Sequence, residues 1–375
     1  MIPFNKPYMT GRELECISQA HAQWHLSGDG PFTQRCNAWL EEHTGCQRAL
    51  LTHSCTAALE MAALLLDIAT GDEVIMPSFT FVSTANAFVL RGGTPVFVDV
   101  REDTLNMDES LLEAAITART KAIVPVHYAG VACEMDAIRF IGDRHGIPIV
   151  EDAAQAVMAR YQGRPLGSIG ALGALSFHET KNVISGEGGA ILINDPSLVK
   201  RAEVIRQKGT NRSEFYRGAV DKYTWVDVGS SYLPSELIAA FLWAQMESAE
   251  ALTSRRIAMW NRYHEAFRDL EEKGLLRRPV IPGGCEHNAH MYYVLLRSAE
   301  ARQKFIATMK AAGILTVFHY VPLHDSPAGR RFGHAAGDLR ITRALSDRLV
   351  RLPMWVGLEP HLEIVIDRAR SAIVQ

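Results

Sequence analysis

The chain has 375 residues, of which 47% are hydrophobic and 22% are charged, an ordinary composition for a soluble globular protein. This length exceeds that of one usual domain and favours two domains, or one large domain with an appendage. Its 39 basic and 42 acidic residues leave a net charge of −3, which gives no long-range attraction for nucleic acid or for an anionic membrane.

Short apolar runs alternate with helical patterns over the first two thirds of the chain. The runs are rich in β-branched residues and several lack polar alternation, as expected for strands that helices cover on both faces. Repeated strand-helix-strand units predict an α/β fold with a mainly parallel, doubly wound sheet. The predicted strands are residues 48–53, 72–77, 94–100, 121–127, 147–152, 174–178 and 189–195.

The pattern changes near residue 233 to one long helical stretch that reaches residue 274. A strand-like segment at 291–297, a helix and a second strand-like segment at 315–320 follow. We therefore expect a large α/β domain over residues 1–245 and a smaller α+β domain over residues 246–375, attached through the helix.

The six cysteines are dispersed, with no C-x-x-C pair and no histidine partner at zinc spacing. We therefore expect reduced thiols and no metal site. The opening MIPFNKPYMTGRELE has no basic segment followed by an apolar stretch, and no apolar run approaches the length of about 18 residues that spans a membrane. A cytoplasmic location is the expectation.

Polar and aromatic side chains follow the first two predicted strands, where an open parallel sheet binds its ligands. Thr52, Ser54 and Thr56 come at the start of a helix, where hydroxyls and free N–H groups either bind a phosphate or simply cap the helix. Phe79 and Phe81 follow the second strand and suit either stacking on a flat ring or packing in the core.

The fifth predicted strand ends in Glu151 and Asp152, and a carboxylate at the edge of a buried strand is costly unless it is paired. A structural salt bridge or a protonated heterocyclic nitrogen would each provide the partner. Lys181 follows, where a solvated surface lysine is the ordinary interpretation. A phosphate cradle, an aromatic ring, a buried carboxylate and a lysine together fit pyridoxal phosphate.

Glycines behind Lys181 allow a tight turn and a close approach of neighbouring backbone or cofactor. They are Gly186, Gly188 and Gly189.

The motifs EDAAQA, G-x-P-L-G-S-I-G at 163–170, SFHETKNVISGEGGAI and HSCTAALE resemble those of the DegT/DnrJ/EryC1/StrS sugar aminotransferases. The similarity extends from FNKP near the start to RLPMW near the end, so it covers essentially the whole chain. It implies fold-type I, the aspartate aminotransferase-like fold of pyridoxal phosphate enzymes.

The resemblance implies a role for individual residues. Lys181 would carry the cofactor covalently and act as general base, Asp152 would pair with the ring nitrogen, and Gln155 would meet the ring hydroxyl. Phe81 would stack on the ring. The implied phosphate ligands are Ser176, Cys55 and Thr56. His178 would either support the site or pack in the strand.

One departure concerns a contact between subunits. Many relatives have an Asn-x-Arg pattern before the connecting helix, with the asparagine reaching the phosphate of the neighbouring subunit. Here Ser231 and Leu233 occupy these positions, and Ser231 can still donate a hydrogen bond. The resemblance thus implies a homodimer, or a larger assembly, with the active site at the interface.

Residues 216–240 and the opening IPFNKPYMTGREL are similar to the dTDP-4-amino-4,6-dideoxygalactose transaminases of enterobacterial common antigen synthesis. This similarity implies dTDP-4-keto-6-deoxyglucose as amino acceptor and L-glutamate as donor, and it leaves amination at C3 or C4 open. Candidate sugar-nucleotide ligands, each with surface solvation as the alternative, are Asn5, Lys6, Lys208, Arg212, Tyr216, Arg217, His319 and Tyr320.

For each alternative function on such a fold, one feature of the sequence argues against it. A related sugar dehydratase replaces the lysine with histidine, and a non-catalytic module would lack Lys181 or Asp152. A cysteine desulfurase needs a catalytic cysteine in a mobile loop, which no cysteine here resembles. A dinucleotide-binding dehydrogenase needs G-x-G-x-x-G after the first strand, and this chain has none.

Overall fold

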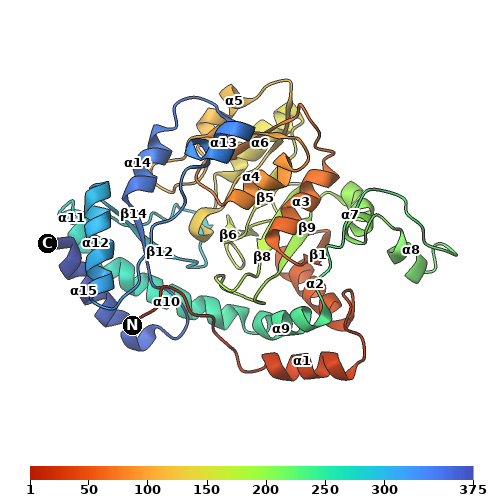
Figure 1. Cartoon of the computed structure of the whole chain (residues 1–375), viewed down its shortest axis with the longest axis horizontal. Coiled ribbons are helices and arrows are strands. Elements are labelled where there is room, and N and C mark those ends of the chain that lie inside the picture. Colours follow the sequence, from red (N-terminus) through yellow and green to blue (C-terminus); the bar gives the residue numbers. More distant parts are fainter. Residues whose placement is uncertain (375) are drawn as a thin grey trace.

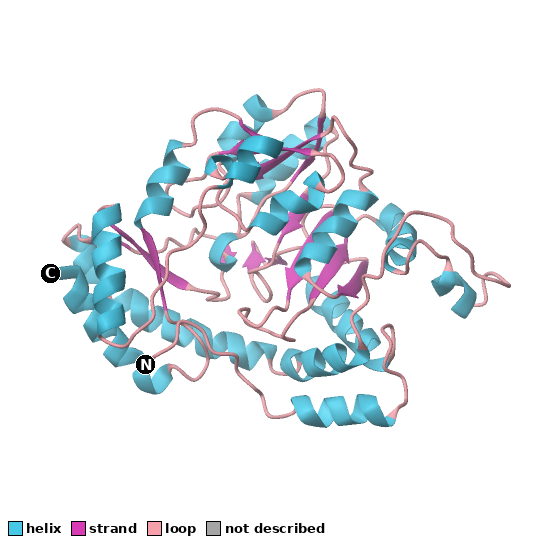
Figure 2. Cartoon of the chain, in the orientation of Figure 1, coloured by secondary structure: helices cyan, strands magenta, loops and turns pink. Residues whose placement is uncertain are grey.

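A computed structural model describes residues 1–374 of the chain. Its large central sheet lies among helices that cover both faces (Figures 1 and 2). The strands of this sheet are Arg48–Thr52 (β1), Glu73–Pro77 (β2), Thr94–Val98 (β3), Thr120–Ile123 (β4), Val150–Asp152 (β5), Leu172–Ser176 (β8), Gly189–Ile193 (β9) and His334–Ala335 (β13).

Two strand groups, β1-β9-β8-β5 and β13-β3-β2-β4, join where β4 and β5 meet through the bridges Ile123–Ile149 and Val126–Asp152. Every pairing is parallel except those of β9, which runs antiparallel to both β1 and β8. The predicted mainly parallel sheet is therefore confirmed. Its antiparallel strand arises because residues 177–188 return the chain directly beside β8, without a crossover helix.

Alternate strand residues point into two cores, one on each face of the sheet. Ala49 and Leu51 join the core shared with α2 and α9, whereas Leu50 joins the core shared with α3 and α7. This double burial explains why the strands read as continuous apolar runs. The helices around the sheet are Glu13–Ala22 (α1), Pro31–Thr44 (α2), Cys55–Leu65 (α3), Val82–Val89 (α4), Leu112–Ala115 (α5), Met135–His145 (α6), Val199–Arg206 (α7), Arg212–Tyr216 (α8) and Glu236–Met246 (α9).

The predicted long helix is interrupted, because the backbone leaves the helical conformation at Ser248, with φ −109° and ψ 5°, and again at Phe267, with φ −103° and ψ 4°. A second core follows, built on a three-stranded sheet of order β10-β12-β14. Its elements and the helices that follow are Ala249–Ala266 (α10), Arg268–Glu272 (α11), Leu276–Arg277 (β10), Tyr292–Leu296 (β12), Ala299–Ala311 (α12), Pro327–Phe332 (α13), Arg340–Arg348 (α14), Leu349–Leu352 (β14) and Leu362–Val374 (α15).

Two segments cross the predicted domain limit near residue 246. The N-terminal Ile2 pairs with Ile314 of the C-terminal part, and β13 pairs with β3 of the large sheet. A small third sheet has the order β11-β6-β7, and β11 brings a segment of the C-terminal part to β6 of the N-terminal part. Its strands are Arg160–Tyr161 (β6), Arg164–Pro165 (β7) and Cys285–Glu286 (β11).

Candidate active site

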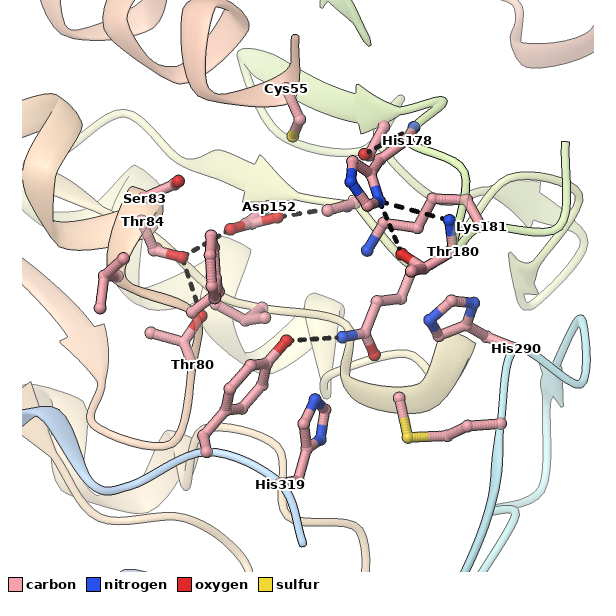
Figure 3. A pocket seen from close by; sticks show the side chains of 18 of the residues that line it. Cys55, Thr80, Ser83, Thr84, Asp152, His178, Thr180, Lys181, His290 and His319 are labelled. Atoms are coloured by element: carbon pink, nitrogen blue, oxygen red, sulfur yellow. Dashed lines mark hydrogen bonds between the residues drawn. The ribbon is translucent and has the colours of Figure 1, made fainter. Parts of the chain in front are cut away.

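A cavity of about 940 Å³ opens at the carboxyl ends of the sheet strands, as expected for a fold of this class. One wall comes from residues that follow β1, β2, β5 and β8. The other comes from the C-terminal part, through residues 290–291, 317–321 and 351–352 together with Leu323, Ser326 and Met354. Figure 3 shows Asp152, Lys181 and His290 facing this space.

Asp152 ends β5 and is buried, with 5% of its surface exposed. Thr84 donates its hydroxyl proton to Oδ2 over 2.7 Å, and the N–H of Ala154 donates to Oδ1 over 3.2 Å. Burial raises the pKa of Asp152, and no side chain within residues 1–374 forms an ion pair with it. Such a carboxylate calls for a cationic partner in the cavity.

The adjacent Glu151 has the structural role that the sequence left open. It is fully buried, and Nε2 of His127 donates to it over 2.9 Å. The N–H of Cys133 donates to Nδ1 of His127 over 3.2 Å, which leaves the ring proton on Nε2. Burial opposes ionisation, but the hydrogen bonds outweigh it and lower the pKa of Glu151. The further donors are the backbone N–H groups of Gly167, Ile169 and Gly170.

Lys181 lies in the return segment between β8 and β9 and lines the cavity. Burial lowers the pKa of Lys181, so its amine loses a proton more readily than a surface lysine does. His178 forms the wall beside it, where its Nδ1 accepts from the N–H of Thr180 over 3.2 Å (Figure 3). Lys181 therefore provides the cavity with an amine that can take up and return a proton.

The first turn of α3 forms a polar cradle at one end of the cavity. Ser54 caps the helix by accepting from the N–H of Ala57 over 3.1 Å, so the capping interpretation holds for this residue. Cys55 and Thr56 line the cavity beside it, and Ser176 lies there at the end of β8. The hydroxyl of Thr56 donates to Ser83 over 2.8 Å.

Gly189 makes this cradle possible. A Cβ atom on Gly189 would lie 2.4 Å from the backbone N of Cys55 and 2.4 Å from the carbonyl carbon of Ser54. Gly186 turns the chain just before, with a φ of +79°. The predicted tight turn and close backbone approach are therefore both confirmed.

The two phenylalanines after β2 divide between core and cavity. Phe79 is 1% exposed and packs on Tyr128, whereas Phe81 lines the cavity with 56% of its surface exposed. Gln155 is held on both sides, because the N–H of Ala129 donates to Oε1 over 2.7 Å and Nε2 donates to the hydroxyl of Tyr320 over 2.9 Å. Phe81 and Gln155 thus present an aromatic ring and an amide to the same cavity.

The predicted sugar-nucleotide ligands fall into two groups. Asn5, His319 and Tyr320 line the cavity, and Nδ1 of His319 lies 2.7 Å from the hydroxyl of Tyr128. Lys6 lies outside it, over the ring of Trp355. The segment that carries α8 extends away from the body of this chain (Figure 1). Its residues lie outside the cavity and are Lys208, Arg212, Tyr216, Arg217 and Ser231.

Three further polar residues of the cavity have no motif of their own in the sequence: Thr84, His290 and Arg351. Nδ1 of His290 donates to Oδ1 of Asn182 over 3.0 Å, since the amide nitrogen of Asn182 is occupied by the carbonyl oxygen of Asn288. Burial holds the pKa of His290 well below its usual range, so the ring is neutral. Only the fold brings these residues to Lys181.

The family model for the DegT/DnrJ/EryC1/StrS aminotransferase family matches residues 8–368. The chain belongs to this family. It is 33% identical to the spore coat polysaccharide biosynthesis protein SpsC of Bacillus subtilis, over 99% of this chain and 97% of that protein. No helix of the described part has the length and apolar character needed to cross a membrane.

Solved structures agree with this assignment. The aminotransferase TlmJ from Streptoalloteichus hindustanus superposes with a TM-score of 0.91 at 30% identity, over 100% of this chain and 99% of that one. The putative sugar aminotransferase Spr1654 from Streptococcus pneumoniae, in its PMP form, gives 0.92 at 26% identity, over 100% and 99%. Spr1654 also has a PLP form. The chain therefore has the fold of fold-type I aminotransferases, and pyridoxal phosphate is its cofactor.

The residues of the cavity fit this group. Asp152 is a buried anion without a cationic partner, as a protonated pyridine nitrogen requires, and the first turn of α3 provides N–H groups for a phosphate, with Ser176 in the same cavity. When bound, the cofactor supplies an electron-poor ring that stabilises negative charge at a carbon losing its proton. Lys181 would hold the cofactor and move that proton at Nζ, Thr84 would orient Asp152, and Phe81 would shield one face.

Proposed function

We propose that this chain transfers the amino group of L-glutamate to C4 of dTDP-4-keto-6-deoxyglucose, giving dTDP-4-amino-4,6-dideoxygalactose and 2-oxoglutarate. The observation that carries the reaction type is the pair formed by Lys181 and Asp152 in one cavity, one with a lowered and one with a raised pKa. Opposite perturbations of an acid and a base in one cleft are typical of catalytic sites.

Transamination needs a group that removes a proton from the donor and returns it to the product carbon. The amine of Lys181 suits this work because burial brings its pKa down toward the working pH. Amino donor and sugar would use the cavity in turn, so we expect ping-pong kinetics.

The proposal of a nucleotide sugar as substrate is supported by the polar side chains on the cavity wall opposite the sheet. His319 and Tyr320 present an imidazole and a phenol to the cavity, and Asn5 adds an amide whose Nδ2 donates to the carbonyl oxygen of Glu179 over 3.4 Å. Hydroxyl-rich ligands are bound by such groups. The enterobacterial common antigen pathway and the dTDP group are proposed from the sequence similarity of residues 216–240 and of the N-terminal segment.

A homodimer is proposed because apolar side chains remain exposed around the mouth of the cavity. The exposed fractions are 56% for Phe81, 48% for Val82, 55% for Phe318 and 60% for Val321. A second copy would cover them. The segment with α8 would then reach the partner's cavity, bringing Ser231 to the phosphate and the predicted basic residues to the dTDP group.

The test is product analysis with a panel of nucleotide keto sugars and glutamate. The dTDP-4-keto-6-deoxyglucose reaction should give an amine at C4 with the galacto configuration by NMR, at a kcat/KM above those of UDP-linked and 3-keto sugars. An amine at C3, or a deoxygenated product, would replace the proposal with a 3-amino transaminase or a sugar dehydratase.

A further inference from the structure

Asn182 directly follows Lys181, and its side chain is held by the C-terminal part of the chain. Asn182 is buried, with 8% of its surface exposed. Its Nδ2 donates to the carbonyl oxygen of Asn288 over 2.8 Å, and its Oδ1 accepts from Nδ1 of His290 over 3.0 Å. Two residues that precede β12 therefore bind the side chain next to the lysine.

The return segment that carries Lys181 is shaped by its own backbone. The N–H of Glu179 donates to the carbonyl oxygen of Gly186 over 2.8 Å, and the N–H of Lys181 donates to that of His178 over 2.9 Å. These bonds close the turn, but they do not attach it to the C-terminal part. The two hydrogen bonds of Asn182 make that attachment.

Asn288 is itself fixed to the large sheet. Its Nδ2 donates to the carbonyl oxygens of Gln155 and Val157 over 2.8 Å each, and its Oδ1 accepts from the N–H of His290 over 3.0 Å. Gln155 lines the cavity in the segment after β5. The residues that hold Asn182 are therefore anchored beside the same cavity.

Arg256 of α10 holds the backbone of these residues from the other side. It is buried, with 4% of its surface exposed, and it donates to the carbonyl oxygens of Ala289 over 3.0 Å and of His290 over 2.6 Å. Ala289 has a φ of +50°, which is unfavourable for a residue with a Cβ atom. Such conformations persist where surrounding contacts hold them, and they cluster at functional sites.

The ring of His290 suits this contact because it is neutral. Burial and, after it, the positive charge of Lys181 hold the pKa of His290 well below its usual range. The neutral ring donates from Nδ1 to Asn182 without placing a second positive charge beside the lysine amine.

We propose that His290 is a positioning residue for Lys181. By holding the side chain of Asn182, it fixes the backbone of residues 181–182 and so the direction in which the lysine enters the cavity. This inference rests on the proposed role of Lys181 as the base of aminotransfer and deepens it. A lysine side chain is long and flexible, so the place that its amine reaches depends on where its backbone is fixed.

The experiment measures the glutamate half-reaction of the holoenzyme by stopped-flow absorbance at several glutamate concentrations. His290→Phe keeps a ring but cannot donate to Asn182. Its maximal rate should fall about 10-fold, while the glutamate concentration at half-maximal rate should stay within about twofold of wild type. His290→Asn keeps an N–H donor near the position of Nδ1 and should recover most of the rate. His264→Phe is the control, since His264 stacks on Trp260 outside the cavity and should keep the wild-type rate.

Asn182→Ala removes the same contact from the other side. Its maximal rate should also fall, and the double variant with His290→Phe should be no slower than Asn182→Ala alone, because the two changes break one interaction. Rate factors that multiply in the double variant would overturn the proposal, and so would a wild-type rate in His290→Phe.

Hydrogen exchange of the holoenzyme without glutamate gives a measurement that does not depend on turnover. The amides of residues 178–188 should exchange faster in His290→Phe than in wild type. Faster exchange with an unchanged glutamate rate would make His290 a purely structural residue. Thermal midpoints show whether His290→Phe is folded; if it is not, Asn182→Ala decides by the same two measurements. A wild-type enzyme that converts glutamate but not the sugar would refute the proposed function and leave this result intact.

Discussion

Thr84 donates its hydroxyl proton to Oδ2 of Asp152 over 2.7 Å, and Thr80 lies 2.8 Å behind it with its own hydroxyl (Figure 3). Because the proton of Thr84 is used by Asp152, Thr80 is the donor to Thr84. This relay favours the charged form of a carboxylate whose burial opposes it. Thr80 and Thr84 therefore orient Asp152 and favour its ionised form, which would pair with the cofactor nitrogen.

We predict that Thr84→Val raises the pKa of Asp152 further, since the charged form loses a hydrogen bond. The acidic limb of the pH profile for the glutamate half-reaction should move to higher pH, and the rate should fall about 10-fold. Stopped-flow absorbance measures both. Thr80→Val should change the pH profile and the rate less, because the Thr80 hydroxyl acts on Asp152 only through Thr84. Equal changes in the two variants would contradict the relay.

Lys181→Ala should remove the visible absorbance that the bound cofactor owes to the lysine. It should also slow proton removal from glutamate by about 10³-fold or more, as expected when a positioned base is deleted. Lys121→Ala is a matched control on the exposed surface. Retention of the absorbance band and of glutamate turnover in Lys181→Ala would show that another amine serves the site.

The Glu151–His127 pair should contribute to stability in a pH-dependent way. The pKa of Glu151 is lower in the folded state than in the unfolded state, where it is about 4.3. The stabilisation by charged Glu151 is therefore present above the unfolded pKa and is lost as the pH falls through the folded pKa. Glu151→Gln should reduce the free energy of unfolding by about 3 kcal/mol near neutral pH, measured in urea. The difference from wild type should shrink below about pH 4.

The control for this variant is Glu113→Gln, which removes a largely solvated partner of Arg144. It should cost less than about 1 kcal/mol at any pH, as exposed ion pairs do. A pH-independent loss in Glu151→Gln would mean that packing, and not the charge of Glu151, stabilises the loop of residues 167–170.

Gly189→Ala should damage the phosphate cradle, because its methyl group would lie 2.4 Å from the backbone of Ser54 and Cys55. Relief of this overlap by displacement of α3 should weaken the binding of pyridoxal phosphate to the apoprotein about 10-fold. Gly283→Ala adds the same methyl group in open space and should leave the affinity unchanged. Equal affinities of the two variants would show that the cradle tolerates the shift.

Much of the sheet could be predicted from local sequence. Strands such as Glu73–Pro77 and Gly189–Ile193 are buried on both faces, so their apolar runs give both their type and their place. The direction of β9 could not be read in the same way, since it depends on how residues 177–188 return. The two-residue strand β13 was missed, because its pairing with β3 depends on contacts far along the chain.

The site was predictable where a motif follows a strand. The predicted cofactor ligands line the cavity, because the strands before them end at one edge of the sheet. They are Lys181, Asp152, Gln155, Ser176, Cys55, Thr56 and Phe81. Arg351 and His290 could not be predicted, because Arg351 lies in a strand of the other sheet, His290 precedes another strand of that sheet, and neither belongs to a motif. The predicted ligands of the α8 segment lie outside the cavity of their own chain, because this segment extends away from the body of the chain (Figure 1).

Transfer of nitrogen in two separate stages tests the proposed aminotransfer most directly. The holoenzyme is incubated with ¹⁵N-labelled glutamate, freed of small molecules by gel filtration, and then mixed with dTDP-4-keto-6-deoxyglucose. Aminotransfer predicts one ¹⁵N atom per active site on the protein after the first stage and the same amount at C4 of the sugar after the second. A sugar product without ¹⁵N, or no product at all, would contradict it.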